Sequence, residues 1–111
     1  MSARAASYQS QIAGKSGEIF RLNGVKFDGY NNGVLEAKGP GYAKFISNGE
    51  FRTWFNGYKG LIDQARRQNI ASNGMPIEWH FAEEVSANVV RRLLAENELG
   101  IIKIIFTAPV P

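Results

Sequence analysis

The sequence predicts a single α/β domain, residues 1–111, in which a central mixed sheet of about five strands is flanked by helices. Three observations lead to this prediction. The chain has the length of one domain. Segments with a helical spacing of apolar residues alternate with short strand-like segments. Its 12 glycines and 4 prolines imply frequent turns, and no linker or repeat interrupts the pattern. The expected order is helix, three strands, helix, strand, helix, strand.

The first half of the chain predicts one helix and a three-stranded meander. Residues 3–13 favour a short helix, and Gly14 suits its C-terminal cap. Strands are expected at 18–22, 25–28 and 34–38, because an Asn-Gly pair and an Asn-Asn-Gly loop separate them. The glycine-rich stretch that follows is expected to break the sheet and lead outward.

The second half predicts two helices and two strands. A helix is expected at 58–72, where an Asn-Gly pair ends it, and a strand at 77–81. The segment 83–99 is the best amphipathic helix, and 101–106 is expected as a buried strand. The apolar stripe of that second helix comprises Val85, Val89, Val90, Leu93 and Leu94.

Composition narrows the possible functions. The chain is 44% hydrophobic and 21% charged, which is typical of a soluble globular domain, and its net charge of +3 suits a polyanionic partner. The absence of cysteine excludes disulfides, thiolate metal sites and a cysteine nucleophile. No apolar run approaches the roughly 20 residues of a membrane span, and the first residues lack the apolar segment of a signal peptide.

The hairpin around 31–33 gathers the residues with chemical potential. A three-residue loop places Asp28 opposite Glu36, and the alternation of strand side chains adds Lys38 to the same face. Tyr30 is then paired with Val34. The opposite face is expected to be apolar, with Val25, Phe27, Leu35 and Ala37.

Two facing carboxylates repel each other unless something holds them together. Magnesium does so, since it prefers oxygen ligands from one or two carboxylates, with water and substrate phosphate completing its shell. A nearby lysine can stabilise developing charge or orient an activated water. The pattern Asp28, Glu36, Lys38 therefore suits a phosphodiester-cleaving centre, although a solvated polar face in which Lys38 neutralises the acids explains the same spacing.

Several segments resemble the restriction-endonuclease-fold toxin domains of bacterial polymorphic toxins, which belong to the PD-(D/E)xK nuclease superfamily. The resemblance covers nearly the whole chain, and its segments are Tyr8-Gln9, Gly14, VKFDG at 25–29, LEAKGPGY at 35–42, QARRQ at 64–68 and IEW at 77–79. It implies the C-terminal part of a larger secreted effector, delivered by type VI secretion into the cytoplasm of a target cell. It also implies a cognate immunity protein.

The resemblance assigns a role to each matching residue. Asp28 and Glu36 correspond to ligands of Mg²⁺ or Mn²⁺, assisted by the backbone carbonyl of Ala37, and Lys38 corresponds to the catalytic lysine. Two departures stand out. Residue 27 is Phe where the superfamily's name has Pro. The first helix has no glutamate for the accessory acid of many relatives, which leaves Gln9 or Gln11 for that place.

Further candidates lie on the predicted helix 58–72, where Gln64, Arg67 and Gln68 share a face. In relatives a glutamine of this helix steadies the site, and Arg67 could hold a phosphate; a solvated face is the alternative. Lys26 is expected beside Lys38 as a possible phosphate contact.

Among the remaining residues, His80 is expected to be a satisfied structural side chain. Three aromatic residues could stack on bases or pack under the loop; they are Trp54, Phe55 and Tyr58.

The function expected from residues and resemblance together is a metal-dependent endonuclease acting on DNA. Two alternatives remain open: the same chemistry on RNA, as in a transfer-RNA-cleaving toxin, and a non-catalytic nucleic-acid-binding module. The clustered acids argue against the binding module, because a pure binder of polyanions has no need of them.

Overall fold

The computed structural model describes residues 3–14, 20–30 and 33–111. Its helices are α1 (Ala3–Ala13), α2 (Gly57–Ser72) and α3 (Glu84–Glu96), with a short 3-10 helix, η1 (Ala43–Phe45). Its strands are β1 (Phe20–Leu22), β2 (Val25–Phe27), β3 (Gly29–Tyr30), β4 (Val34–Lys38), β5 (Ile46–Ser47), β6 (Glu50–Phe51), β7 (Ile77–Phe81) and β8 (Lys103–Phe106). The α/β class is confirmed. None of the described helices is long and apolar enough to cross a membrane.

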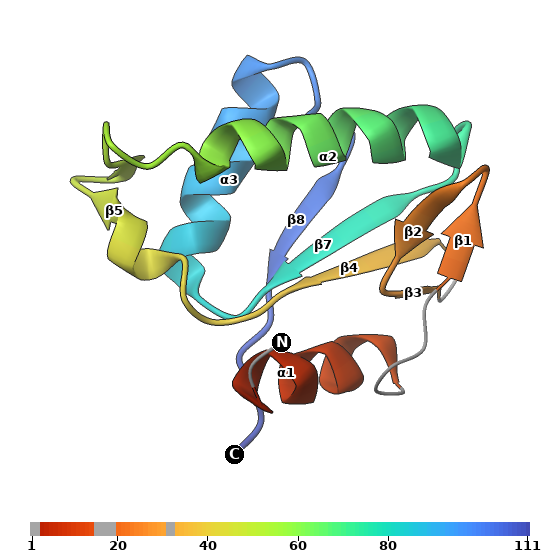
Figure 1. The fold of residues 1–111 in the computed structure, drawn as a ribbon, viewed down its shortest axis with the longest axis horizontal. Coiled ribbons are helices and arrows are strands. Elements are labelled where there is room, and N and C mark those ends of the chain that lie inside the picture. The colour runs from red at the N-terminus through yellow and green to blue at the C-terminus, as the bar shows by residue number, and fades with distance from the viewer. Residues whose placement is uncertain (1–2, 15–19, 31–32) are drawn as a thin grey trace.

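The central sheet has the strand order β3-β4-β7-β8, so four strands replace the expected five or so. β3 runs antiparallel to β4, and β4, β7 and β8 are mutually parallel. The difference arises at Asp28, where the chain bends between β2 and β3. Beyond this bend β2 pairs with β1 in a separate two-stranded ribbon (Figure 1).

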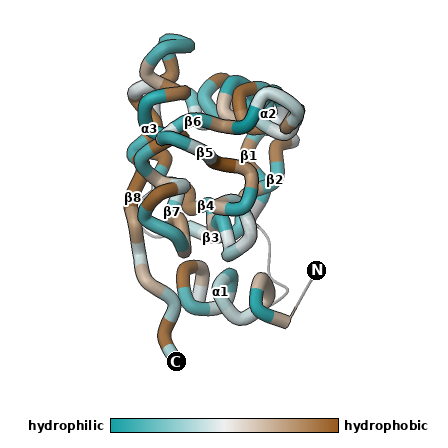
Figure 2. The backbone as a smooth tube through the Cα atoms, turned by 90° about the vertical axis from the view of Figure 1, so that its left-hand side faces the viewer, coloured by the Kyte–Doolittle hydropathy of each residue, from teal (hydrophilic) through white to brown (hydrophobic). Residues whose placement is uncertain are grey.

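Helices cover both faces of the sheet, α1 on one side and α2 with α3 on the other (Figure 1). The view turned by 90° shows the same order of layers (Figure 2). Small residues bring α1 close to the strands: a Cβ on Gly39 would lie 3.3 Å from Ala5, and a Cβ on Gly29 would collide with Ala13 at 2.8 Å. Ala5 and Ala13 therefore mark the face of α1 that packs on the sheet.

The main core lies between the sheet and the helices α2 and α3. Alternate residues of β7 point into it, among them the fully buried Trp79 and Phe81. Most of the predicted stripe of α3 is confirmed, but Val85 is 43% exposed and Ala87 is buried instead. The helix begins one residue later than predicted and ends three residues earlier; Glu98 adopts a left-handed φ of 60° near its C-terminal end.

The C-terminal strand starts at Lys103, two residues later than predicted, and is not uniformly buried. Lys103 and Phe106 are exposed, whereas Ile104 is buried. Residues beyond this strand hold α1 in place. The Tyr8 hydroxyl donates to the Thr107 carbonyl at 2.8 Å.

The hairpin β5–β6 was not predicted from the sequence. It follows the glycine-rich stretch that was correctly expected to leave the sheet. Asn48 and Gly49 form its turn with φ values of 53° and 78°. Two successive positive φ angles are typical of a two-residue type I′ turn, for which Asn-Gly is the preferred sequence. The Asn48-Gly49 dipeptide was therefore the available signal.

Candidate active site

Strand β4 directs its side chains alternately to the two faces of the sheet. Glu36 and Lys38 point to the α2 side, where both contact Gln64. Ala37 lies between them on the α1 side, which continues at Gly39 next to Ala5. The predicted shared face of Glu36 and Lys38 is confirmed by these contacts.

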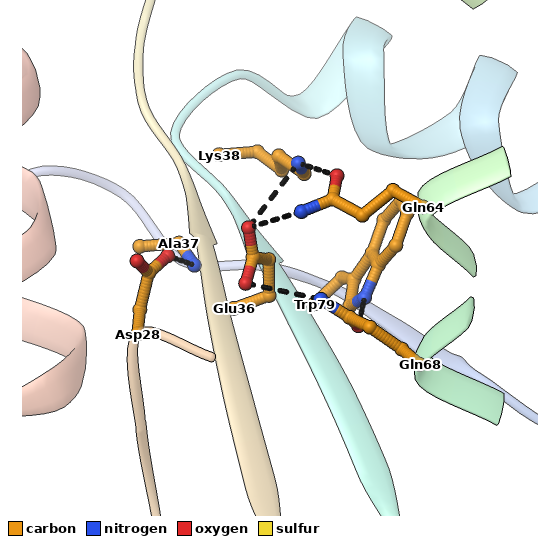
Figure 3. A network of polar contacts seen from close by, with 7 residues as sticks. All are labelled: Asp28, Glu36, Ala37, Lys38, Gln64, Gln68 and Trp79. Atoms are coloured by element: carbon orange, nitrogen blue, oxygen red, sulfur yellow. Dashed lines mark hydrogen bonds and ion pairs between the residues drawn. The ribbon is translucent and has the colours of Figure 1, made fainter. Parts of the chain in front are cut away.

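Glu36 is the centre of a buried polar network (Figure 3). The side chain is only 7% exposed. Its Oε2 accepts hydrogen bonds from Gln64 Nε2 at 2.7 Å and from Lys38 Nζ at 3.4 Å, and its Oε1 accepts one from Gln68 Nε2 at 3.2 Å. Two neighbouring turns of α2 thus hold one carboxylate through two amides.

Trp79 on β7 sets the direction of this network. Its indole N–H can only donate, and it donates to Gln68 Oε1 at 2.7 Å. The Nε2 of Gln68 is therefore turned toward Glu36. The parallel register places Trp79 directly beside Glu36 on the neighbouring strand.

Lys38 is buried to an unusual degree for a lysine, with 8% of its surface exposed. Its ammonium group donates to Gln64 Oε1 as well as to Glu36, and lies 4.8 Å from the centre of the Trp79 ring. These three contacts hold a positive charge at a fixed point beside the carboxylate.

Electrostatics make the ionised form of Glu36 costly. Burial raises the pKa of the Glu36 carboxyl, the charge of Lys38 lowers it, and the charge of Asp28 raises it again. The net direction is upward, so the attraction of Lys38 does not fully compensate for the loss of water. The interaction with Asp28 shows that the two acids lie within electrostatic reach of each other.

Asp28 lies at the bend between β2 and β3. Its N–H donates to the Leu35 carbonyl at 3.0 Å, and its Oδ2 accepts the N–H of Ala37 at 2.7 Å. The carboxylate thus continues the pairing of β4 where the neighbouring strand turns away (Figure 3). The N–H and C=O of a strand residue point the same way, so the Ala37 carbonyl is directed to this edge as well.

The predicted pairing of Tyr30 with Val34 is confirmed, but the pairing of the two strands ends at Gly29 and Leu35, so Asp28 is not paired with Glu36 as predicted. Two loop residues, 31 and 32, lie outside the described part of the chain. A second detail of the prediction is wrong. Phe27 and Val25 pack with Val34 in the core on the α2 side rather than on the opposite face. The bend at Asp28 is the reason, because it interrupts the strict alternation of an extended strand.

The two glutamines considered for α1 have different positions. Gln9 is buried, four residues from both Ala5 and Ala13, and so shares the helix face that packs on the sheet. Gln11 does not belong to the site. Its amide bonds the Ala108 carbonyl at 2.9 Å and the Val110 N–H at 3.0 Å, which fastens the C-terminal tail to α1.

The three candidate residues on α2 also differ in their positions. Gln64 and Gln68 contact Glu36, whereas Arg67 is exposed on the outer part of that face. Lys26 is exposed on β2, whereas the ammonium group of Lys38 contacts Glu36 and Gln64. Lys26 and Arg67 line one pocket together with Gln64.

His80 has the structural role that was predicted. Its Nδ1 is 2.8 Å from Thr107 Oγ1 and its Nε2 is 3.0 Å from Glu78 Oε1. The Phe55 ring packs under the loop, stacked on Phe45 at 4.3 Å, whereas Trp54 is 62% exposed.

Two contributors to the site were missed by sequence reasoning. Trp79 orients Gln68 and lies against Lys38, and its only local signal was an aromatic residue in a buried strand. Glu83 accepts the backbone N–H groups of Gly41, Tyr42 and Ala43 at 3.2, 3.0 and 2.9 Å. It thereby fixes the segment that follows β4.

The comparison with protein families agrees with this geometry. The family model described as restriction endonuclease fold toxin 5 matches residues 5–84, which include most of α1 and the whole network around Glu36 and end at the first residue of α3. The chain belongs to this family. Comparisons with curated proteins and with solved structures gave no match. The protein is therefore a toxin domain of restriction-endonuclease fold, and this family membership indicates nuclease activity.

Proposed function

We propose that this toxin domain is a metal-dependent endonuclease that hydrolyses DNA, with Asp28, Glu36 and Lys38 at its centre. One observation carries the proposal. Glu36 and Lys38 are buried side by side and held by α2 and β7, while Asp28 lies at the adjoining edge of β4. A charged pair that only solubilised the surface would be exposed and would need no such support.

The residues at this end of β4 fit a hard divalent cation. Glu36 Oε1 accepts a single hydrogen bond, one Asp28 oxygen is bonded to Ala37, and the Ala37 carbonyl points to the same edge. Within the described ranges, no three His, Cys, Asp or Glu side chains come together. The donor set is thus two carboxylates and a carbonyl, which suits Mg²⁺ or Mn²⁺ completed by water and substrate phosphate.

Bound at these oxygens, the cation would neutralise phosphate charge and lower the pKa of a water molecule. The protein's own contribution is to hold charge in place. Lys38 presents its ammonium group at a fixed point where negative charge develops on the phosphate. Gln64 links Lys38 to Glu36, so one side chain of α2 holds both the lysine and the carboxylate.

The biological setting is proposed from the family. A toxin domain of this kind would act in the cytoplasm of a target bacterium after delivery, for instance by type VI secretion, as part of a longer effector. The producing cell would then need a cognate immunity protein. These elements rest on family membership, and the network around Glu36 supports only the catalytic part.

Incubation with supercoiled plasmid and with total RNA tests the proposal. We expect plasmid nicking with Mg²⁺ or Mn²⁺ and none with a chelator. Lys38→Ala should abolish cleavage, while Lys103→Ala, which removes an exposed lysine of β8, should not. Cleavage of RNA but not of plasmid would mean that the domain performs the same hydrolysis on RNA instead of DNA. A folded Lys38→Ala protein that cuts at the wild-type rate would refute the assignment.

A further inference from the structure

A pocket of about 500 Å³ opens beside Lys38, between the segment after β4 and the first turns of α2. We call it the aromatic pocket, because Tyr42, Phe45 and Phe55 line it. Its volume lies in the usual range for small-ligand sites. Since Lys38 forms part of its wall, a molecule bound there would lie directly next to the proposed centre.

The charge around the aromatic pocket selects for an anion. Lys38 and Lys44 line it, and no described acidic residue does. The pocket between β6 and α3 is different, because Glu50 and Glu96 lie in its wall beside two arginines. Of these two cavities, only the aromatic pocket combines ring surfaces with lysines and has no described acidic residue in its wall, which suits the base and the phosphate of a nucleotide.

A second pocket continues the surface on the other side of Gln64. This cationic pocket of about 300 Å³ is lined by Lys26, Arg67 and Gln64. Neither Lys26 nor Arg67 forms an ion pair with another described residue. Gln64 lines both pockets and bonds to both Lys38 and Glu36, so the two pockets are neighbours and both adjoin the residue that holds the pair.

We propose that the two pockets form one binding track for an unpaired DNA segment: the aromatic pocket takes a base next to the scissile phosphate, and the cationic pocket holds a backbone phosphate. This deepens the proposed function and rests on it for the position of the cut. The rings line a hollow rather than a convex surface. A base can reach them only after leaving its stack, which favours single-stranded or locally opened DNA over intact duplex.

Gly60 offers a way to close the aromatic pocket without disturbing the fold. It lines the pocket from α2, and a Cβ at this position would meet nothing within 4 Å. Alanine and leucine are both better helix formers than glycine. Gly60→Leu should therefore obstruct the pocket at no cost in stability, and Gly60→Ala is the matched control with the same helix benefit and little added volume.

Binding is measured by fluorescence anisotropy with a labelled 12-nucleotide single strand and the corresponding duplex, in an Asp28→Asn background that prevents cleavage. The asparagine oxygen can still accept the Ala37 N–H. We expect the single strand to bind at least roughly fivefold more tightly than the duplex, and Gly60→Leu to remove a similar factor, as for the loss of one base stack. Gly60→Ala should bind like its parent.

Salt dependence tests the cationic pocket. Arg67→Gln should lower the slope of log Kd against log salt concentration by about 0.7, the value for one phosphate contact on a single strand. Equal binding of single strand and duplex, or unchanged binding by Gly60→Leu, would overturn the proposal. The comparison of single strand with duplex needs no pocket variant, so it tests the proposal even if Gly60→Leu does not fold. If the wild type prefers the single strand as expected but cleaves nothing, the nuclease proposal is refuted and the proposal of the binding track stands.

Discussion

Replacing Gln68 by methionine removes the amide that joins Trp79 to Glu36 while keeping the side-chain volume. Gln68 is 0% exposed, so water cannot replace either lost hydrogen bond. The indole N–H loses its acceptor at 2.7 Å, and the Glu36 carboxylate loses a donor at 3.2 Å. An unpaired buried donor costs about 1–3 kcal/mol, and a hydrogen bond to a charged group contributes about 1.5–3 kcal/mol. Burial of the apolar methionine side chain offsets part of these costs, so we expect Gln68→Met to lower the free energy of unfolding by about 3 kcal/mol.

Urea denaturation measures this loss as a lower midpoint with an unchanged slope. Thermal unfolding should occur about 12 °C earlier, since about 4 °C per kcal/mol is typical of a domain of this size. The control is Arg66→Met, an exposed position on the same helix, which should change the free energy of unfolding by less than about 0.5 kcal/mol.

A double-mutant cycle then isolates the bond to Trp79. In a Trp79→Phe background the indole N–H is already gone, so Gln68→Met should cost about 1–3 kcal/mol less than in the wild type. A cost below about 1 kcal/mol in the wild type, or no coupling to Trp79, would show that the network around Glu36 does not have the rigidity inferred here.

Three further outcomes are expected. Millimolar Mg²⁺ should raise the melting temperature of the wild type but not of Asp28→Asn. Because burial raises the pKa of Glu36, acidification should abolish this rise at a higher pH than it would for an ordinary carboxylate. An equal rise in both proteins would show that Asp28 is not a metal ligand. Burial also raises the pKa of Tyr8 to about 12, so the stability that this residue contributes is complete below its ordinary value of 10 and is lost as the pH rises through 10 to 12. Tyr8→Phe should flatten alkaline unfolding in that window when followed by circular dichroism, and an unchanged curve would contradict the burial. Expression of the wild-type domain in bacteria should arrest growth while Lys38→Ala does not, and harmless expression of the wild type would count against a toxin acting in the cytoplasm.

The local parts of the site could be predicted from sequence because they depend on one strand and one helix. Alternation along residues 34–38 placed Glu36 and Lys38 on one face. Helical spacing grouped Gln64 with Gln68, but it also included the exposed Arg67. Trp79 could not be assigned, because its place beside Glu36 depends on the parallel pairing of β4 with β7 across an intervening helix.

Each error has a physical cause. The bend at Asp28 places Phe27 on the face that period-two alternation assigns to the acids. Gln11 was a candidate for the place of the accessory acid on the first helix, but its partners are Ala108 and Val110. Contacts separated by 99 residues leave no periodic trace in a sequence.

The hydrogen bonds between α1 and residues 107–110 impose an order on folding. Tyr8 and Gln11 are synthesised before their partners Thr107, Ala108 and Val110, which lie 97 to 99 residues further along the chain. Closing so long a loop has to precede the gain from these contacts, so α1 should dock late and detach early. Its amide protons should exchange faster than those of β7. The layer over one face of the sheet would then loosen while the core around Trp79 remains intact.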